Sequence, residues 1–337
     1  MSAARAGAAI ADQSVVAALG AGRMGRGIAQ AFAFAGHPVL LIDLKGRAQD
    51  AARELERSAL MEISENLEAL AELGAFDASL IAGTMDRIRF VFAPEAANAV
   101  ANAGLAFECV PEVLDAKQSA LEFAGRHLPE DAVLASTTST FLSTELAGCT
   151  SRPGRFLNAH WLNPAFLIPL VELSPHPGTA PDALDNLHRT LTDIGKTPVI
   201  CAPAPGYIVP RLQVLLMNEV ARLIEQGIAS AEEIDRATRR GLGVRYAGMG
   251  VAEFIDYGGN ETLHYASRYL SEALDDDRYA APRIIEDNMR AGRNGLREGV
   301  GLYDWSETDK DAYRRDVLAR LVRQLRSQNL LPKAAAN

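Results

Sequence analysis

The sequence predicts an α/β domain with a doubly wound, mostly parallel sheet, followed by an all-α domain. Two observations lead to this prediction. Over the first two-thirds of the 337 residues, short apolar runs alternate with longer amphipathic segments. Beyond residue 206 the alternation stops, and apolar residues recur at helical spacing. We therefore expect a disordered leader over residues 1–12, a sheet domain over residues 13–203 and a helical domain over residues 204–330.

Each expected strand is a short apolar run. The strands are expected at residues 15–19, 39–42, 87–91, 105–110, 132–135, 156–161, 170–174 and 197–201. Helices are expected at residues 24–35, 47–73 and 114–126. Gly36 and Gly74 are expected to end the first two helices. This order of elements is typical of an open parallel sheet with helices on both faces.

The boundary between the domains is predicted at residues 202–206, Ala-Pro-Ala-Pro-Gly. Two prolines and a glycine prevent a continuous helix there. The next helical segment, residues 212–227, carries an apolar stripe that we expect to face a core. The stripe consists of Leu212, Leu215, Leu216, Val220, Leu223 and Ile224. Ser230 is expected to cap the helix that follows.

Composition excludes several classes of function. The formal net charge of −9 argues against nucleic acids and anionic membranes as partners. Apolar runs stay below the ~18 residues that a membrane-spanning helix needs. The Ala-rich N-terminus lacks the sustained apolar core of a secretory signal. The three cysteines are widely spaced and indicate neither a disulfide framework nor a metal site, which favours a reduced, cytoplasmic location.

The most informative stretch is residues 20–25, Gly-Ala-Gly-Arg-Met-Gly. It follows an apolar strand-like run and opens a helix-like segment, as a dinucleotide-binding turn does. Gly20 permits a tight turn, Gly22 lets the backbone approach the phosphates, and Gly25 lets the helix pack on the strand. The helix N-terminus offers free N–H groups and a partial positive charge to the pyrophosphate.

Asp43 ends the second apolar run, where an acid accepts hydrogen bonds from the adenosine ribose. A carboxylate at this point repels a 2′-phosphate, so the sequence favours NAD over NADP. The residues after Asp43 offer no obvious group to bind such a phosphate, with Lys45 and Arg47 as the weak exceptions. A bare glycine fingerprint can also be a turn without a ligand, but the flanking strand, helix and acid argue against that interpretation.

A second motif, residues 160–164, reads His-Trp-Leu-Asn-Pro and is followed by Glu172. Two neighbouring strands would bring His160 and Glu172 together, giving an oriented general base for alcohol oxidation. Ser139, in a hydroxyl-rich turn, would donate a hydrogen bond to the substrate oxygen. Asn163 would hold a loop or a ligand by its amide. The alternative is a structural histidine, a solvated glutamate and ordinary Ser/Thr caps.

Several motifs occur in one order along nearly the whole chain. They are the glycine fingerprint, Val110-Pro111-Glu112 with Lys117, the Ser/Thr turn at residues 136–140, His160-x-x-Asn163-Pro164, Glu172, and residues 205–212, Pro-Gly-Tyr-Ile-Val-x-Arg-Leu. This combination resembles the 3-hydroxyacyl-CoA dehydrogenase family. The resemblance implies a Rossmann-like domain, a helical dimerisation domain and hence a homodimer, and NAD-dependent oxidation of an L-3-hydroxy group.

The resemblance also implies roles for single residues. It assigns the base to His160, the orienting partner to Glu172 and the substrate-oxygen donor to Ser139. Glu112 and Lys117 would lie near the nicotinamide half of the cofactor. The residues expected to contact the cofactor are therefore Gly20, Gly22, Arg23, Met24, Gly25, Asp43, Glu112 and Lys117.

Three features depart from the family pattern. Pro210 stands where the family usually has an active-site asparagine, and proline has no side-chain amide to offer a substrate. Residues 47–77 contain three Arg, no Lys and eight acids, which is unfavourable for the phosphates of CoA. Residues 169–177 and 241–247 resemble the L-gulonate 3-dehydrogenase (lambda-crystallin) branch, which handles free hydroxy acids. Arg245 would then anchor a substrate carboxylate or, alternatively, cap or bridge helices.

Three functional hypotheses follow. The leading one is an NAD-dependent dehydrogenase of L-3-hydroxyacyl-CoA thioesters with a His–Glu general base. The second is a dehydrogenase of a CoA-free 3-hydroxy acid such as gulonate or carnitine. The third is a structural protein that binds the cofactor without turnover, which Pro210 alone supports.

Overall fold

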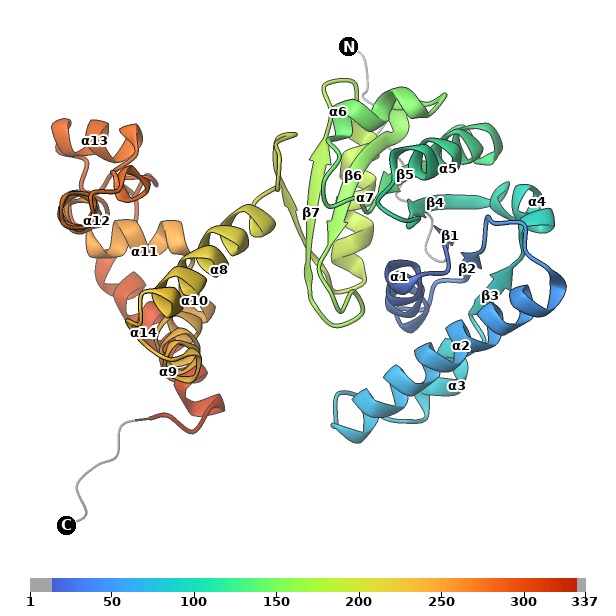
Figure 1. The fold of residues 1–337 in the computed structure, drawn as a ribbon, viewed down its shortest axis with the longest axis horizontal. Helices are drawn as coiled ribbons and strands as arrows, with labels where there is room; N and C mark the ends of the chain where they lie inside the picture. The colour runs from blue at the N-terminus through green and yellow to red at the C-terminus, as the bar shows by residue number, and fades with distance from the viewer. Residues whose placement is uncertain (1–13, 332–337) are drawn as a thin grey trace. The chain divides into compact units, whose positions relative to one another are not determined.

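The structure is a computed structural model that describes residues 14–331, so the expected leader over residues 1–12 lies outside the described range. The chain divides into two compact units, Met1–Leu216 and Met217–Asn337. Figure 1 shows the elements of both units along the chain.

The first unit is built on one eight-stranded sheet in the order β3-β2-β1-β4-β5-β6-β7-β8. The strands are β1 Val15–Leu19, β2 Val39–Ile42, β3 Ile88–Val91, β4 Ala103–Glu108, β5 Val133–Ser136, β6 Phe156–Trp161, β7 Leu170–Pro175 and β8 Thr197–Ile200. Every neighbouring pair is parallel except β6 and β7, which are antiparallel. The direction of winding reverses between β1 and β4, which is where such sheets bind their ligands. The predicted doubly wound, mostly parallel sheet is confirmed.

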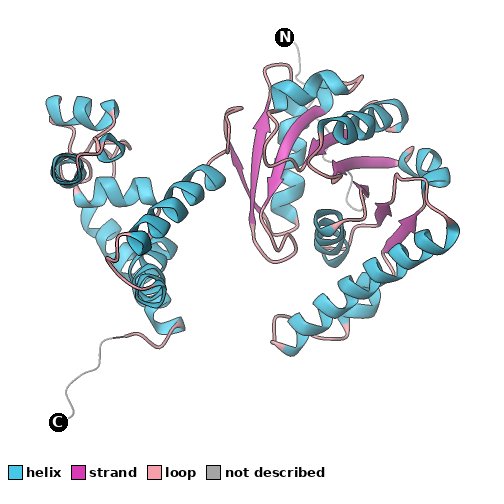
Figure 2. Cartoon of the chain, in the orientation of Figure 1, coloured by secondary structure: helices cyan, strands magenta, loops and turns pink. Residues whose placement is uncertain are grey.

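Helices cover both faces of this sheet, as Figure 2 shows. They are α1 Arg23–Phe34, α2 Gln49–Glu72, α3 Leu80–Met85, α4 Ala96–Val100, α5 Leu114–His127, α6 Ser143–Leu146 and α7 Pro181–Asp193. Helices α1, α2 and α7 contribute to the core on one face, and α4, α5 and α6 contribute to the core on the other. The helices expected over residues 24–35, 47–73 and 114–126 form within two residues of the expected bounds.

The two cores explain why the strands were visible in the sequence. On one face, Phe32 of α1 packs against Phe107 of β4 and Trp161 of β6. On the other, Leu121 of α5 and Phe156 of β6 are fully buried. Because both faces are covered, the central strands are continuous apolar runs rather than alternating ones.

The second unit is helical, as predicted. It contains α9 Ala231–Ala237, α10 Val244–Gly248, α11 Val251–Gly258, α12 Asn260–Leu274, α13 Arg283–Arg290 and α14 Lys310–Ser327, with a π-helical turn at Thr238–Gly243. The Ser230 hydroxyl accepts a hydrogen bond from the Glu233 N–H at 3.3 Å, which is the expected cap of α9. Asp256 of α11 is a buried anchor, because its carboxylate accepts hydrogen bonds from the Trp305 Nε1–H and the Tyr303 N–H.

Helix α8, Val209–Glu225, spans the division between the units, which falls between Leu216 and Met217. The prediction that its apolar stripe faces a core is wrong for the chain by itself, because no residue of α8 is buried within the described chain. Leu212 is 54% exposed and Leu215 is 61% exposed. An apolar stripe indicates that a surface will cover the helix but does not say which molecule supplies that surface. Within residues 14–331, no helix is both long and apolar enough to cross a bilayer.

Candidate active site

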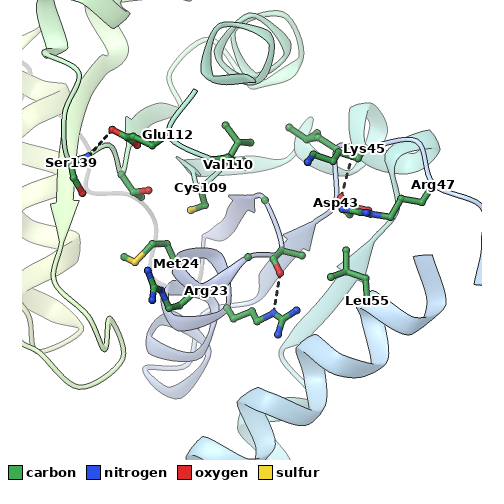
Figure 3. Close-up of a pocket in the computed structure, with 17 residues that line it drawn as sticks. Arg23, Met24, Asp43, Lys45, Arg47, Leu55, Cys109, Val110, Glu112 and Ser139 are labelled. Carbon is green, nitrogen blue, oxygen red and sulfur yellow. Dashed lines mark hydrogen bonds and ion pairs between the residues drawn. The ribbon is translucent and has the colours of Figure 1, made fainter. Parts of the chain in front are cut away.

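A pocket of about 470 Å³ lies at the carboxyl ends of β1, β2 and β4. Its walls come from the glycine fingerprint, the β2–α2 connection, the β4–α5 connection and the turn after β5. Figure 3 shows Asp43 and Arg47 at one end of the pocket and Ser139 and Glu112 at the other. The position is the switch point of the sheet, where the fold predicts a dinucleotide.

The glycine fingerprint brings backbone close to backbone. Gly20 has φ 127°, and a Cβ at this position would lie 2.6 Å from the carbonyl oxygen of Cys109. A Cβ on Gly25 would overlap the carbonyl oxygen of Gly20. Helix α1 begins after Gly22 without a side-chain cap and without an acid in its first turn. Its first N–H groups are therefore available to an anion, which fits a pyrophosphate.

Asp43 closes the other end of the fingerprint unit. Its carboxylate is buried, accepts the Nε–H of Arg47 at 2.6 Å and accepts the N–H of Lys45 at 3.3 Å. Arg47 is thus engaged by Asp43 and is not a free phosphate-binding cation. The geometry fits a carboxylate that faces the ribose end of the pocket.

Glu112 organises the turn that follows β5. Its Oε1 atom accepts the N–H groups of Ser139 at 3.1 Å and Thr140 at 3.0 Å, together with the hydroxyls of Thr138 and Thr140. Burial alone would raise the pKa of Glu112, but the Thr138 and Thr140 hydroxyls and the Lys117 ammonium outweigh burial and lower it to about 2. The ionised carboxylate therefore fixes the turn that carries Ser139.

Lys117 lies behind Glu112 rather than in the pocket wall. The ammonium is fully buried and contacts both oxygens of Glu108, at 3.1 and 3.0 Å, and Glu112 at 3.1 Å. Two carboxylates and a hydroxyl, that of Ser136 on Glu108, satisfy this buried charge cluster. The sequence prediction missed Glu108. The sequence feature that could have indicated Glu108 is a single acid at the end of an otherwise apolar strand, Ala103–Glu108.

The predicted His160–Glu172 pair is formed. The two residues face each other across the antiparallel β6–β7 pair, and the His160 Nδ1 atom lies 2.8 Å from Glu172 Oε2. Both side chains are buried. The other oxygen of Glu172 accepts the N–H groups of Ile208 at 2.9 Å and Val209 at 2.8 Å. Burial opposes ionisation of Glu172, but the His160 ring and these two N–H groups outweigh it and lower the pKa of the carboxyl.

Tyr207 joins this pair to the Ser139 turn. Its ring stacks on the His160 ring with centroids 4.9 Å apart and planes 8° apart. Its hydroxyl donates to the Thr138 carbonyl at 2.9 Å and accepts from Asn158 Nδ2 at 3.0 Å. The sequence analysis included Tyr207 in a motif but assigned it no role. Neither its stacking on His160 nor its bond to Thr138 can be predicted from sequence spacing.

Three predicted residues of the first unit, His160, Glu172 and Asn163, are not among the residues that line the pocket. Asn163 is exposed in the loop after β6, and its side chain makes no hydrogen bond within residues 14–331. Arg245 belongs to the second unit, where its guanidinium lies over the Phe254 ring at 5.0 Å. Pro210 is the second residue of α8, a first-turn position where a missing N–H removes no intrahelical hydrogen bond.

These features define a class of protein. A doubly wound sheet with an uncapped helix N-terminus and a ribose-side acid at its switch point is the fold of a dinucleotide-dependent oxidoreductase. The same unit contains a buried histidine that is paired with a buried carboxylate.

Comparison with known families specifies the class. Residues 15–204 match the 3-hydroxyacyl-CoA dehydrogenase, NAD binding domain, and residues 206–305 match the 3-hydroxyacyl-CoA dehydrogenase, C-terminal domain. The chain belongs to the 3-hydroxyacyl-CoA dehydrogenase family, and its first unit contains the family's NAD-binding domain.

Individual relatives lie in two groups. The chain is 32% identical to the human lambda-crystallin homolog over 256 residues, which cover 75% of this chain and 77% of the relative. It is 31% identical to the mitochondrial hydroxyacyl-coenzyme A dehydrogenase of Mus musculus over 296 residues, which cover 86% of this chain and 90% of the relative. The crystal structure of a 3-hydroxyacyl-CoA dehydrogenase from Archaeoglobus fulgidus is similar with a TM-score of 0.73 and 29% identity, covering 94% of this chain and all of that one.

Proposed function

We propose that this protein is an NAD-dependent dehydrogenase that reversibly oxidises the L-3-hydroxy group of a 3-hydroxyacyl-CoA to the 3-keto form. The observation that carries the proposal is the buried His160–Glu172 pair at 2.8 Å in the same unit as an NAD-binding domain. Bound NAD supplies the hydride acceptor. The residues of the chain supply binding, orientation and proton transfer.

The cofactor would be held by the fingerprint and the two acids of the pocket. The free N–H groups at the start of α1 suit the pyrophosphate, and Gly22 leaves room for it because no atom lies within 4 Å of its Cβ position. Asp43 would accept the ribose hydroxyls. Arg23, Met24 and Glu112 line the same pocket and would complete its walls.

The proton would leave through His160. Because Nδ1 lies against Glu172, the Nε2 atom is free to accept the hydroxyl proton, and the carboxylate stabilises the resulting imidazolium. The lowered pKa of Glu172 keeps that carboxylate ionised at neutral pH. Ser139 would donate its hydroxyl hydrogen to the substrate oxygen. In the reverse direction the imidazolium returns the proton to the ketone oxygen.

A second candidate substrate, a CoA-free 3-hydroxy acid such as gulonate or carnitine, is favoured by one observation. Helix α2 carries seven acids and two arginines in the sequence Gln49–Glu72. Such a surface repels the phosphates of CoA. In this case Arg245 would bind the substrate carboxylate.

One experiment separates these candidates. Initial rates are measured with acetoacetyl-CoA and NADH, and with free L-3-hydroxy acids and NAD. Turnover of the thioester supports the leading proposal, whereas strong turnover of free acids alone overturns it. NADH binding, measured by fluorescence, without turnover of any substrate would instead support a structural role.

We further propose that the protein is a homodimer in the cytoplasm. The exposed apolar residues of α8, with Leu215 61% and Met217 60% exposed, support an interface there. The free thiols of Cys109, Cys149 and Cys201 suit a reducing compartment. Sedimentation equilibrium of the wild type and of Leu215→Asp tests the dimer, and a wild-type monomer would contradict it.

A further inference from the structure

Tyr207 is held in a backbone conformation that a bulky residue rarely adopts. Its φ is 44°, directly after Gly206 at φ 77°. A tyrosine in the left-handed region persists where surrounding contacts determine it, and such residues cluster at functional sites. The side chain is 8% exposed. The contacts of the Tyr207 side chain therefore indicate which interactions hold the backbone in this conformation.

The ring stacks against the imidazole of His160. It lies flat on His160, with centroids 4.9 Å and planes 8° apart. The next two residues, Ile208 and Val209, donate their N–H groups to Glu172. A segment of three consecutive residues thus holds both members of the base pair. Because Glu172 binds Nδ1 in the plane of the imidazole and Tyr207 covers a face, the ring is confined in two directions.

The hydroxyl bridges strand β6 and the turn that follows β5. It donates to the Thr138 carbonyl, next to Ser139, and accepts from Asn158, which lies on β6 with His160. Burial raises the pKa of Tyr207 above its usual value, which further favours the protonated phenol that donates this hydrogen bond. The hydroxyl therefore links the strand of the base to the turn of the oxygen donor.

We propose that Tyr207 is a positioning residue that sets the plane of the His160 ring with its own ring and the separation of His160 from the Ser139 turn with its hydroxyl. The inference rests on the proposed function of His160 as general base. It assigns two separable contributions to one side chain, so two variants test it independently.

The variants are Tyr207→Phe, which keeps the ring, and Tyr207→Leu, which removes it. Loss of one neutral hydrogen bond should lower kcat about 2- to 10-fold in Tyr207→Phe. Loss of the stack should lower kcat on the order of 10²-fold in Tyr207→Leu, as small misplacements of catalytic groups do. The NADH dissociation constant should stay unchanged in both. Phe34→Leu, which removes an aromatic ring at the last residue of α1, is the control and should keep wild-type kcat.

A spectroscopic readout separates the inference from the proposed function. In protein labelled with ¹³C-histidine, the His160 ring protons should be shifted upfield by the stacked phenol, with His160→Gln assigning the signals. The upfield shift should persist in Tyr207→Phe and be lost in Tyr207→Leu, or in Tyr207→Met if the leucine variant does not fold. Unchanged ring signals or wild-type kcat in Tyr207→Leu would overturn the role of the ring. Wild-type kcat in Tyr207→Phe would overturn the role of the hydroxyl. Absence of turnover in the wild type with a normal spectral response would overturn the proposed function and leave the stacking role standing.

Discussion

The β1–α1 turn and the β6–β7 hairpin belong to one sheet but are built in different ways. The turn is made by six consecutive residues, 20–25, and depends on side chains that are absent: a Cβ on Gly20 or Gly25 would meet backbone atoms. The hairpin depends on side chains that are present. His160 is held by Glu172 across the strands and by Tyr207 from a later segment.

This difference separates two kinds of sensitivity. The turn is determined by close backbone approaches, of Gly25 to Gly20 within the turn and of Gly20 to Cys109 after β4. A single added methyl group should therefore disturb cofactor binding and leave acid–base chemistry untouched. The hairpin is determined by a network of contacts between segments distant in sequence, so its variants should lose turnover and keep the cofactor. Variants of His160 and Gly25 test whether the two regions are separable in this way, and variants of Asp43 and Glu112 test the two acids of the pocket.

The largest effect is expected for His160→Ala. Removal of the general base should lower kcat on the order of 10²–10⁴-fold, while the NADH dissociation constant stays unchanged. Steady-state rates and NADH fluorescence titration measure the two quantities. His188→Ala on α7, whose imidazole makes no hydrogen bond within the described chain, is the control. An unchanged rate would remove His160 from the mechanism.

Gly25→Ala should lower cofactor affinity, which is the opposite of the pattern expected for His160→Ala. The added methyl group overlaps the Gly20 carbonyl and pushes α1 away from β1, so NADH affinity should fall on the order of 10²-fold and the free energy of unfolding should fall by about 1–3 kcal/mol. Titration and urea unfolding check this. Gly148→Ala, where nothing lies within 4 Å of the Cβ position, should change neither. Wild-type affinity in Gly25→Ala would show that the close approach is not needed.

Asp43→Ala tests the ribose end of the pocket. Loss of charge-assisted hydrogen bonds to the ribose should weaken NAD binding about 10-fold and should narrow the preference over NADP, because Arg47 is released from its 2.6 Å bond to the carboxylate. Dissociation constants for both cofactors measure this, with the exposed Asp50→Ala as control. Equal binding of NAD and NADP by the wild type would refute the ribose assignment.

The smallest effect concerns pH. The pKa of Glu112 is lowered from 4.5 to about 2, so the carboxylate stabilises the fold fully above the unfolded pKa and loses that contribution as pH falls toward 2. Since the side chain is 37% exposed, solvent screening limits the contribution to about 1 kcal/mol. Glu112→Gln should therefore be less stable than wild type at about pH 7, and the difference in stability should be smaller at about pH 3.5.

Urea unfolding at the two pH values measures that difference. The exposed Glu65→Gln on α2 is the matched control and should follow the wild type at both. If the difference in the free energy of unfolding stays constant with pH, Glu112 stabilises the fold by packing and not by its charge.

The sequence predicted regions governed by local rules. Strands Val15–Leu19, Val39–Ile42 and Phe156–Trp161 form at the expected positions because burial on both faces demands continuous apolar runs. The Ser230 cap forms because it needs only its own helix. The His160–Glu172 pair was predictable because a short connection between neighbouring strands limits the register.

Other features were not predictable from local pattern. The apolar stripe of α8 indicated that some surface covers the helix, but it did not indicate which molecule supplies that surface. Nothing in the sequence around Tyr207 predicted its stacking on His160. The sequence around Glu108 gave only a weak indication of its pairing with Lys117. Each of these contacts joins residues whose spacing in sequence carries no information about their distance in space.

By itself, the sequence determined the strand–turn–helix unit that receives a dinucleotide, the acid after the second strand and the candidate base with its partner. These follow from backbone conformation, helix dipoles and strand pairing, which act over a few residues. Only the tertiary structure decided that Lys117 is hidden behind Glu112, that Arg47 is bound by Asp43 and that Tyr207 spans the base and the Ser139 turn. Burial in a shared core selects such partners, because a desolvated charge or hydroxyl must find its complement among whatever the fold brings within reach.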